Sequence, residues 1–307
     1  MSAIELSGVR KEFGDIVAVD DLDLTIAEGE VFGFLGPNGA GKSTTINMLL
    51  DFVRPTAGRI KVLGLDAQEH SVEVRERTGV LPEGYDVYDR LTGRQHVEFA
   101  LRSKDVDEDP ISVLERVGIA DAADRKAGGY SKGMAQRLVL GMALVGDPDL
   151  LILDEPSSGL DPAGAKEMRE IVRTEADRGA TVFFSSHVLG QVEAVCDRVG
   201  IMRAGELIAE DSIQGLREAA GGEETLEITV DSCSEEQLQP VRELVGVTGA
   251  TTDGGSVTVS CEADVKTKVI STLEGEGVSV RDFQTHEASL EDLFLAYTES
   301  GKTEVTA

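Results

Sequence analysis

The chain has 307 residues, 41% of them hydrophobic and 4% aromatic, and its formal net charge at pH 7 is −28. This length allows one large core or two domains. No apolar run approaches the roughly 18 residues of a membrane helix, which argues against a chain that crosses a bilayer as helices. The negative charge disfavours nucleic acid as a partner, because such binding depends on Lys and Arg side chains that neutralise phosphates.

Acidic residues outnumber basic ones 57 to 29 and are spread along the whole chain. One hypothesis is adaptation to high salt, where a Debye length of about 3 Å at molar salt screens the repulsion between like charges. The alternative is an acidic protein of a mesophile. The first residues lack the basic and apolar regions of a signal peptide, and Cys196, Cys233 and Cys261 are far apart and odd in number. We therefore expect a cytoplasmic protein without disulfides or a cysteine metal site.

Short runs that alternate polar and apolar residues predict strands at 3–6, 16–19 and 22–26, and the apolar run 31–35 predicts a buried strand. Phe13 lies in the polar segment between the first two strands. From residue type alone, this aromatic side chain either covers the sheet edge, which is the favoured interpretation, or offers a face on which a base could stack.

A glycine-rich loop of the pattern GxxxxGK[ST] follows the buried strand and leads into a helical pattern at 45–50. Glycines let successive backbone N–H groups turn towards a phosphate, and the helix N-terminus adds the positive end of its dipole. Because strand, loop and helix occur in the required order, a turn that binds nothing is disfavoured. Lys42 would reach the β- and γ-phosphates and Ser43 would bind Mg²⁺. The predicted phosphate-binding residues are Gly36, Pro37, Asn38, Gly39, Ala40, Gly41, Lys42, Ser43 and Thr44.

Further along, a strand is predicted at 59–64, and residues 92–146 are largely helical in pattern, with Thr92 as an N-cap. Within this region Ser131 caps another helix and follows two glycines. An exposed helix N-terminus with Ser and Gly can bind a phosphate. An ordinary capped helix is nevertheless the favoured interpretation of this segment taken alone.

The apolar run 150–153 is typical of a central parallel strand and ends in Asp154 and Glu155. Ligands of α/β sheets bind at the carboxyl ends of such strands, so Asp154 is placed to hold Mg²⁺ and Glu155 to accept a proton from attacking water. The alternative, acids that only cap the next helix, is disfavoured by the phosphate loop. After a helix at 163–178 and a strand at 180–184, His187 stands at the same edge and could touch the γ-phosphate.

Five motifs occur in an order that resembles the ATPase subunits of ABC transporters: the phosphate loop, the turn around Ser131, the strand ending in Asp154, the segment 158–162 and His187. The resemblance covers about residues 3–217. It implies an α/β fold, a P-loop NTPase with a RecA-like parallel sheet, an antiparallel edge sheet and a helical subdomain. It also implies an ATPase that uses ATP and Mg²⁺ and acts as a homo- or heterodimer.

The resemblance assigns roles to single residues. Lys42, Glu155 and His187 would be catalytic, with Glu155 as the base and His187 as the switch histidine. Ser43 and Asp154 would bind Mg²⁺.

Two such subunits close head-to-tail on two ATP molecules. By the resemblance, Ser131 and Gly133 would contact the γ-phosphate of the ATP held by the opposite protomer, and Phe13 would stack on adenine, which reverses the preference drawn from its residue type. Three positions depart from the family pattern. Residues 130–134 read Tyr-Ser-Lys-Gly-Met rather than Leu-Ser-Gly-Gly-Gln, Phe13 replaces the commoner Tyr, and Glu83, which can still bind Mg²⁺ or water, replaces Gln. The signature and the Leu-Pro-Glu sequence together resemble ABC-2 type exporter ATPases, including the drug-resistance-like group.

Two glycines after a helix at 213–220 predict a boundary between an ATPase domain at 1–220 and an accessory domain at 221–307. The second domain reads strand, helix, strand, strand, helix, strand, which predicts a small α+β ferredoxin-like unit. A short closing helix is expected at 289–297. We expect a structural or dimer-supporting role for this domain rather than a ligand sensor, because no catalytic constellation occurs in it.

The favoured function is the ATP-binding and ATP-hydrolysing subunit of an ABC-2 type transporter, which drives export through a separate membrane permease and lies peripherally on the inner face of the cell membrane. One alternative is a soluble ABC-type ATPase of DNA repair or translation, which the acidic surface disfavours. Another is a regulatory module that only binds ATP, which the intact Lys42, Asp154, Glu155 and His187 disfavour. The transported substrate is not encoded in this chain.

Overall fold

The computed structural model describes residues 1–219 and 223–287. The chain divides into two compact units, Met1–Ser212 and Ile213–Ala307. This division falls between residues 212 and 213, so helix α8 (Ile213–Ala219) belongs to the second unit, whereas the sequence placed it in the first. The predicted helix at 289–297 lies outside the described residues. In the part of the chain that is described, no helix is long and apolar enough to cross a membrane.

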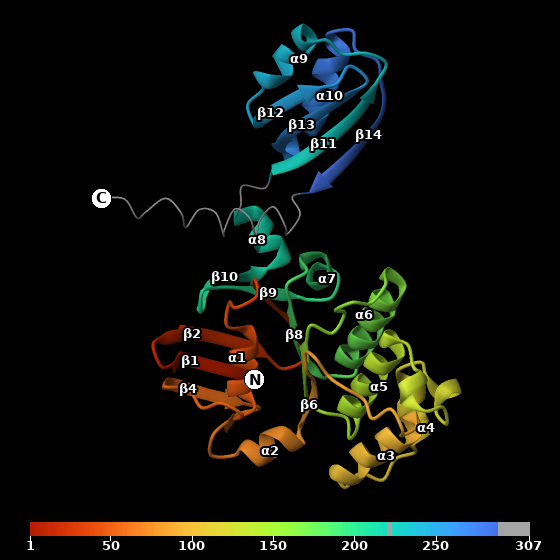
Figure 1. Ribbon diagram of the computed structural model, residues 1–307. Coiled ribbons are helices and arrows are strands. Elements are labelled where there is room, and N and C mark those ends of the chain that lie inside the picture. Colours follow the sequence, from red (N-terminus) through yellow and green to blue (C-terminus); the bar gives the residue numbers. More distant parts are fainter. Residues whose placement is uncertain (220–222, 288–307) are drawn as a thin grey trace. The chain divides into compact units, whose positions relative to one another are not determined.

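The first unit begins with an antiparallel sheet (Figure 1) whose strand order is β2-β1-β4-β5. The strands are β1 (Ser2–Phe13), β2 (Ile16–Ala27), β4 (Ala57–Val62) and β5 (Leu65–Asp66). The sequence predicted shorter strands here. The pairing of β1 with β2 contains several register shifts, and each shift interrupts the alternation of buried and exposed side chains that marks a strand in the sequence.

The second sheet has the order β10-β9-β3-β8-β7-β6, and its strands are parallel except for β10 at one edge. Every residue of β3 and β7 is buried, which explains their continuous apolar sequences. Because β3, β7 and β8 are parallel, the residues that follow them meet at one edge of the sheet, called here the carboxyl edge. The strands are β3 (Val31–Leu35), β6 (Thr78–Leu81), β7 (Leu150–Asp154), β8 (Thr181–Ser186), β9 (Arg198–Arg203) and β10 (Glu206–Ser212).

Three helices, α3 (Gly93–Ser103), α4 (Pro110–Arg116) and α5 (Lys132–Leu144), pack together and form what we call the helical segment (Figure 1). Side chains fix where they begin. Thr92 and Gln95 form a capping box at the start of α3, and the Ser131 hydroxyl accepts a hydrogen bond from the Met134 N–H at the start of α5. Both predicted N-caps are confirmed. The sheets are flanked by α1 (Lys42–Leu49), α2 (Ser71–Glu76), α6 (Pro162–Asp177) and α7 (Leu189–Glu193).

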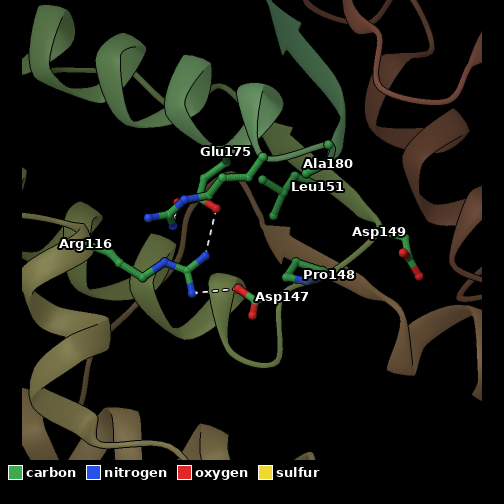
Figure 2. Close-up of a pocket in the computed structure, with 9 residues that line it drawn as sticks. Arg116, Asp147, Pro148, Asp149, Leu151, Glu175 and Ala180 are labelled. Atoms are coloured by element: carbon green, nitrogen blue, oxygen red, sulfur yellow. Dashed lines mark hydrogen bonds and ion pairs between the residues drawn. The ribbon is translucent and has the colours of Figure 1, made fainter.

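Ion pairs fasten the helical segment to α6 beside a cavity of about 530 Å³ (Figure 2). The Arg116 guanidinium of α4 lies 2.7 Å from Glu175 Oε2 and 2.9 Å from Asp147 Oδ1. Glu175 is buried and also pairs with Arg178 at 3.0 Å. A buried carboxylate needs such partners, since desolvation without them is costly. These contacts lie beside Asp149 and Ala180, where β7 and β8 begin, so the fastening is at the edge opposite to the carboxyl edge.

The second unit is a four-stranded antiparallel sheet of order β12-β13-β11-β14 with two helices. With the element order βαββαβ, this is the predicted ferredoxin-like arrangement. The turn between β12 and β13 is held by Asp253, whose carboxylate accepts hydrogen bonds from the N–H groups of Gly255 and Ser256. The elements are β11 (Glu223–Val230), α9 (Glu235–Arg242), β12 (Val247–Thr252), β13 (Ser256–Glu262), α10 (Lys266–Gly275) and β14 (Val280–Glu287).

Candidate nucleotide-binding and active site

The loop between β3 and α1 has the backbone geometry of an anion cradle. Gly39 and Gly41 have φ values of 82° and 110°, which side chains other than glycine rarely adopt. A Cβ on Gly41 would lie 2.5 Å from the carbonyl oxygen of Ala18, so the close approach also requires glycine. No side chain caps α1, so its first backbone N–H groups remain available to a bound anion.

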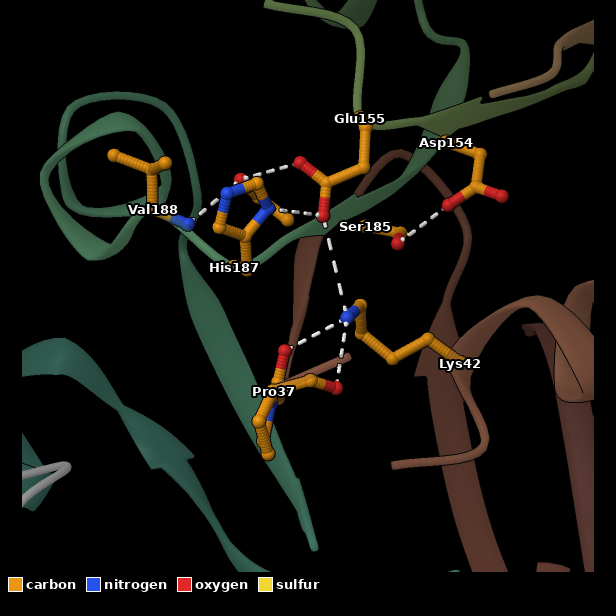
Figure 3. Close-up of polar contacts among 9 residues, drawn as sticks. Pro37, Lys42, Asp154, Glu155, Ser185, His187 and Val188 are labelled. Atoms are coloured by element: carbon orange, nitrogen blue, oxygen red, sulfur yellow. Dashed lines mark hydrogen bonds and ion pairs between the residues drawn. The ribbon is translucent and has the colours of Figure 1, made fainter. Parts of the chain in front are cut away.

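Lys42 begins α1 and is buried under this loop (Figure 3). Its Nζ donates a hydrogen bond to the carbonyl oxygen of Gly36 at 2.7 Å and lies 3.4 Å from that of Pro37. It is also 4.0 Å from Glu155 Oε1. Burial lowers the pKa of Lys42, and the nearby carboxylates of Glu155, Asp154 and Glu83 oppose that shift. The ammonium group is therefore desolvated and only partly compensated, which favours a phosphate as a further partner.

The two acids at the end of β7, Asp154 and Glu155, are held by the serines of the neighbouring strand β8. Asp154 Oδ1 accepts a hydrogen bond from Ser185 Oγ at 2.8 Å, and Ser43 also hydrogen-bonds this carboxylate. Burial nevertheless raises the pKa of Asp154. The sequence analysis did not find Ser185 or Ser186 as site residues. In the sequence, the two serines are visible only as polar residues that end an apolar strand. Their role as partners of the two acids follows from the parallel pairing of Asp154 with Ser185.

Glu155 stands at the centre of the polar contacts (Figure 3). Its Oε1 lies 2.8 Å from His187 Nδ1, and its Oε2 lies 3.4 Å from Ser186 Oγ. Its backbone has a φ of 51°, a left-handed conformation that is strained for a residue with a side chain. The backbone N–H of Glu155 donates to the Ser185 carbonyl oxygen at 3.0 Å. A strained, buried carboxylate beside a histidine and a lysine is an arrangement typical of an active site.

Lys42, Asp154 and Glu155 line one cavity of about 420 Å³ at the carboxyl edge. The loop offers N–H groups and an ammonium for phosphates, while Ser43, Asp154 and Glu83 offer the oxygen ligands that Mg²⁺ prefers. The residues present therefore fit a nucleotide with its metal ion. The cavity is lined by Ile16, Val17, Ala18, Asn38, Gly39, Ala40, Gly41, Lys42, Ser43, Thr44, Glu83, Asp154 and Glu155.

Six predicted site residues do not line this cavity: Phe13, Gly36, Pro37, Ser131, Gly133 and His187. Gly36 and Pro37 instead present carbonyl oxygens to Lys42, and His187 contacts Glu155. Phe13 is 48% exposed at the end of β1, and the Lys11 ammonium lies 4.7 Å from the centre of its ring. Ile16 and Val17, after the turn, line the cavity instead, and the sequence analysis did not single them out. Ser131 lies just before α5 as its N-cap and Gly133 in its first turn, and both are outside this cavity.

Comparison with known proteins agrees with this geometry. The model of the ABC transporter family matches residues 19–158, and the model of the DrrA1-3-like ATP-binding protein C-terminal domain matches residues 212–298. The daunorubicin resistance ATP-binding protein DrrA3 of Streptomyces coeruleorubidus is 34% identical over 306 residues, which are 97% of this chain and 96% of that protein. The chain belongs to the ABC transporter ATP-binding family.

Other members of the ABC transporter ATP-binding family extend the comparison. The linearmycin resistance ATP-binding protein LnrL of Bacillus subtilis is 32% identical over 96% of this chain and 98% of that protein. The Nod factor export ATP-binding protein I of a Rhizobium strain is 36% identical, over 96% and 97%. A solved ATP-binding subunit of an ABC transporter superposes with a TM-score of 0.65 at 26% identity, over 71% of this chain and 93% of that one.

Members of this family hydrolyse ATP to power transport, and this chain is an ATPase of the ABC-2 export type. The P-loop NTPase fold predicted from the sequence is confirmed. An ABC transporter ATP-binding protein binds nucleotide, which agrees with the cradle and the ammonium described above.

Asp154→Asn is expected to raise the melting temperature of the nucleotide-free protein and to abolish its stabilisation by MgATP. Burial raises the pKa of Asp154, so the ionised carboxylate at neutral pH costs folding free energy, and stability is lost as the pH rises through the raised pKa. Asn removes that cost and keeps an oxygen that can accept from Ser185. Each ~1 kcal/mol relieved corresponds to about 2–4 °C.

Melting curves measured with and without MgATP at neutral and mildly acidic pH check this expectation. The advantage of the Asn variant should shrink as the pH falls towards the raised pKa of Asp154, because a growing fraction of that carboxyl is then neutral. A nucleotide-free variant that melts at a lower temperature at neutral pH contradicts it.

Proposed function

We propose that the chain is the ATP-hydrolysing subunit of an ABC-2 type exporter that dimerises around two MgATP and drives a separate membrane permease. The observation that carries the proposal is the convergence of Lys42, Asp154 and Glu155 in a cavity that fits a nucleotide, with His187 in contact with Glu155. The names of similar proteins, which include resistance and export ATP-binding proteins, support export as the purpose.

In the proposed reaction the loop N–H groups and Lys42 bind the phosphates. Ser43 and Asp154, with Glu83 nearby, would hold Mg²⁺, which when bound neutralises charge on the β- and γ-phosphates. Glu155 accepts the proton of the attacking water, and its contact with His187 Nδ1 fixes the direction of the carboxylate. Phe13 is proposed to stack on adenine, which its exposed position permits.

Ser131 and Gly133 are proposed to close over the nucleotide bound by the opposite protomer. Their position at a capped helix start outside the protomer's own cavity supports this assignment. We further propose that the permease holds the dimer at the inner face of the cell membrane. In the same proposal the assembly is a homo- or heterodimer, and residues 221–307 have a structural or dimer-supporting role.

Phosphate release from the purified full chain tests the proposal. We expect saturable hydrolysis of ATP that stops when EDTA removes Mg²⁺, and a dimer by light scattering when ATP is present and hydrolysis is blocked. Co-expression with the six-helix membrane protein encoded nearest to it tests the partner. A chain that binds ATP but releases no phosphate, alone or with that membrane protein, would instead be a regulatory module.

A further inference from the structure

One face of α5 packs against the loop that follows Glu155. A Cβ placed on Gly159 would lie 2.0 Å from Lys132 Nζ, so the end of the lysine side chain covers the backbone of this loop. A Cβ on Gly133 would lie 3.4 Å from Leu160 Cδ2. One turn further along α5, Gln136 Nε2 donates a hydrogen bond to the carbonyl oxygen of Pro156. Positions 132, 133 and 136 share one side of a helix, so the contact is a continuous seam.

Gln136 is the buried part of this seam. Only 1% of its surface is exposed, an unusual environment for a primary amide. Its Oε1 is buried and has no hydrogen-bond partner among the described residues. Gln136, Lys132 and Glu155 also line a second cavity, of about 400 Å³, on the side of Glu155 that faces α5. An apolar side chain would fill this place without an unsatisfied acceptor, so the stability of the fold does not explain the amide.

The contact made by Gln136 lies next to the strained residue. Glu155 keeps a φ of 51°, and its N–H is held on one side by the Ser185 carbonyl oxygen. The next residue in the chain is Pro156, which has no backbone N–H. Its carbonyl oxygen is therefore the one backbone group of this residue that a hydrogen bond can hold. Gln136 supplies that bond. The strained conformation is thus restrained from β8 before it and from α5 after it.

We propose that Gln136 is a positioning residue for Glu155, and that it couples the position of the start of α5 to the position of the Glu155 carboxylate. The inference rests on the proposed role of Glu155 as the base. When the N-terminal end of α5 engages a nucleotide, the bond from Gln136 to Pro156 transmits that position to the residue beside the carboxylate. Loss of the bond is expected to leave the phosphate-binding loop intact, because Gln136 does not line the nucleotide cavity and its hydrogen bond goes to Pro156.

Gln136→Met tests the proposal, because Met has a similar length and no donor. We expect kcat to fall about 10- to 100-fold, as for a catalytic group displaced by a fraction of an ångström or more, with KM for ATP and the affinity for MgATP within about twofold. Hydrogen–deuterium exchange of the backbone amides of residues 157–160 should become faster, while that of α1 is unchanged. Gln68→Met, which makes the same chemical change far from the loop, should alter neither quantity.

Lys132→Ala provides a second variant that folding cannot obscure, since Lys132 is exposed. It should speed exchange of the same loop and lower kcat about two- to fivefold, a part of the effect of Gln136→Met. The proposal is overturned if both variants keep normal exchange and normal kcat, or if kcat and nucleotide affinity fall together. Normal turnover by Glu155→Gln would show that Glu155 is not the base. The exchange measurement would still show separately whether Gln136 holds the loop after Glu155.

Discussion

Glu155→Gln is expected to bind MgATP as tightly as the unaltered protein and to hydrolyse it about 100-fold or more slowly, the usual contribution of a general base. The amide has the same shape and can still contact His187 Nδ1, which lies 2.8 Å from Oε1. It cannot take a proton from water. Because ATP hydrolysis is blocked after the nucleotide has bound, the ATP-bound dimer should accumulate, and light scattering would detect it.

The matched control for this variant is Glu175→Gln. Glu175 is also a buried glutamate, but it pairs with Arg116 at the opposite edge of the sheet. Its replacement should lower the melting temperature and leave kcat within about twofold, since Glu175 does not line the nucleotide cavity. Phosphate release and nucleotide binding measured on both variants separate loss of chemistry from loss of structure. Near-normal turnover by Glu155→Gln would remove this residue from the role of base.

Lys42→Met is expected to weaken MgATP binding about 100-fold, or ~2.7 kcal/mol, because charge-assisted contacts with two phosphates are lost. The methionine keeps the apolar stem that fills the buried site. Stability without nucleotide should not fall, since burial lowers the pKa of Lys42 and the charged ammonium is therefore disfavoured in the folded protein. The increase in melting temperature that MgATP produces in the unaltered protein should disappear.

Lys166→Met is the control for that experiment. Lys166 lies on α6, its side chain is 70% exposed, and within the described part of the chain its ion pair is a helical contact with Glu170. It should bind MgATP normally, which shows that a change of one unit in net charge is not the cause. Binding that is equally strong in Lys42→Met would mean that the loop N–H groups alone supply the affinity.

Patterns that depend on near neighbours in the sequence were predicted well. The phosphate loop, its lysine and the two acids after β7 lie in one cavity, because a glycine-rich turn and the end of a parallel strand are local signals. The ferredoxin-like order of the second unit followed from the alternation of its strands and the hairpin at Asp253.

Features that depend on pairing across the fold were not predicted. The bulges of β1 and β2 hid the true length of these strands, since each register shift is set by the partner strand. Ser185 became a site residue only through its alignment with Asp154. Gln136 reads as an ordinary polar residue on a helix, and its burial shows only when α5 is placed against the loop after Glu155.

The contacts that attach the helical segment to the rest of the unit differ in chemistry at the two edges of the parallel sheet. Near the start of β7 the contact is ionic, through Arg116, Asp147 and Glu175, and at the carboxyl edge it includes the buried amide-to-carbonyl bond from Gln136. Salt screens the exposed Asp147 contact, whose side chain is 83% exposed, far more than the buried amide bond. Rising ionic strength therefore loosens the end remote from the chemistry first. The contact beside Glu155 is therefore expected to be less sensitive to salt than the exposed contact at the opposite edge.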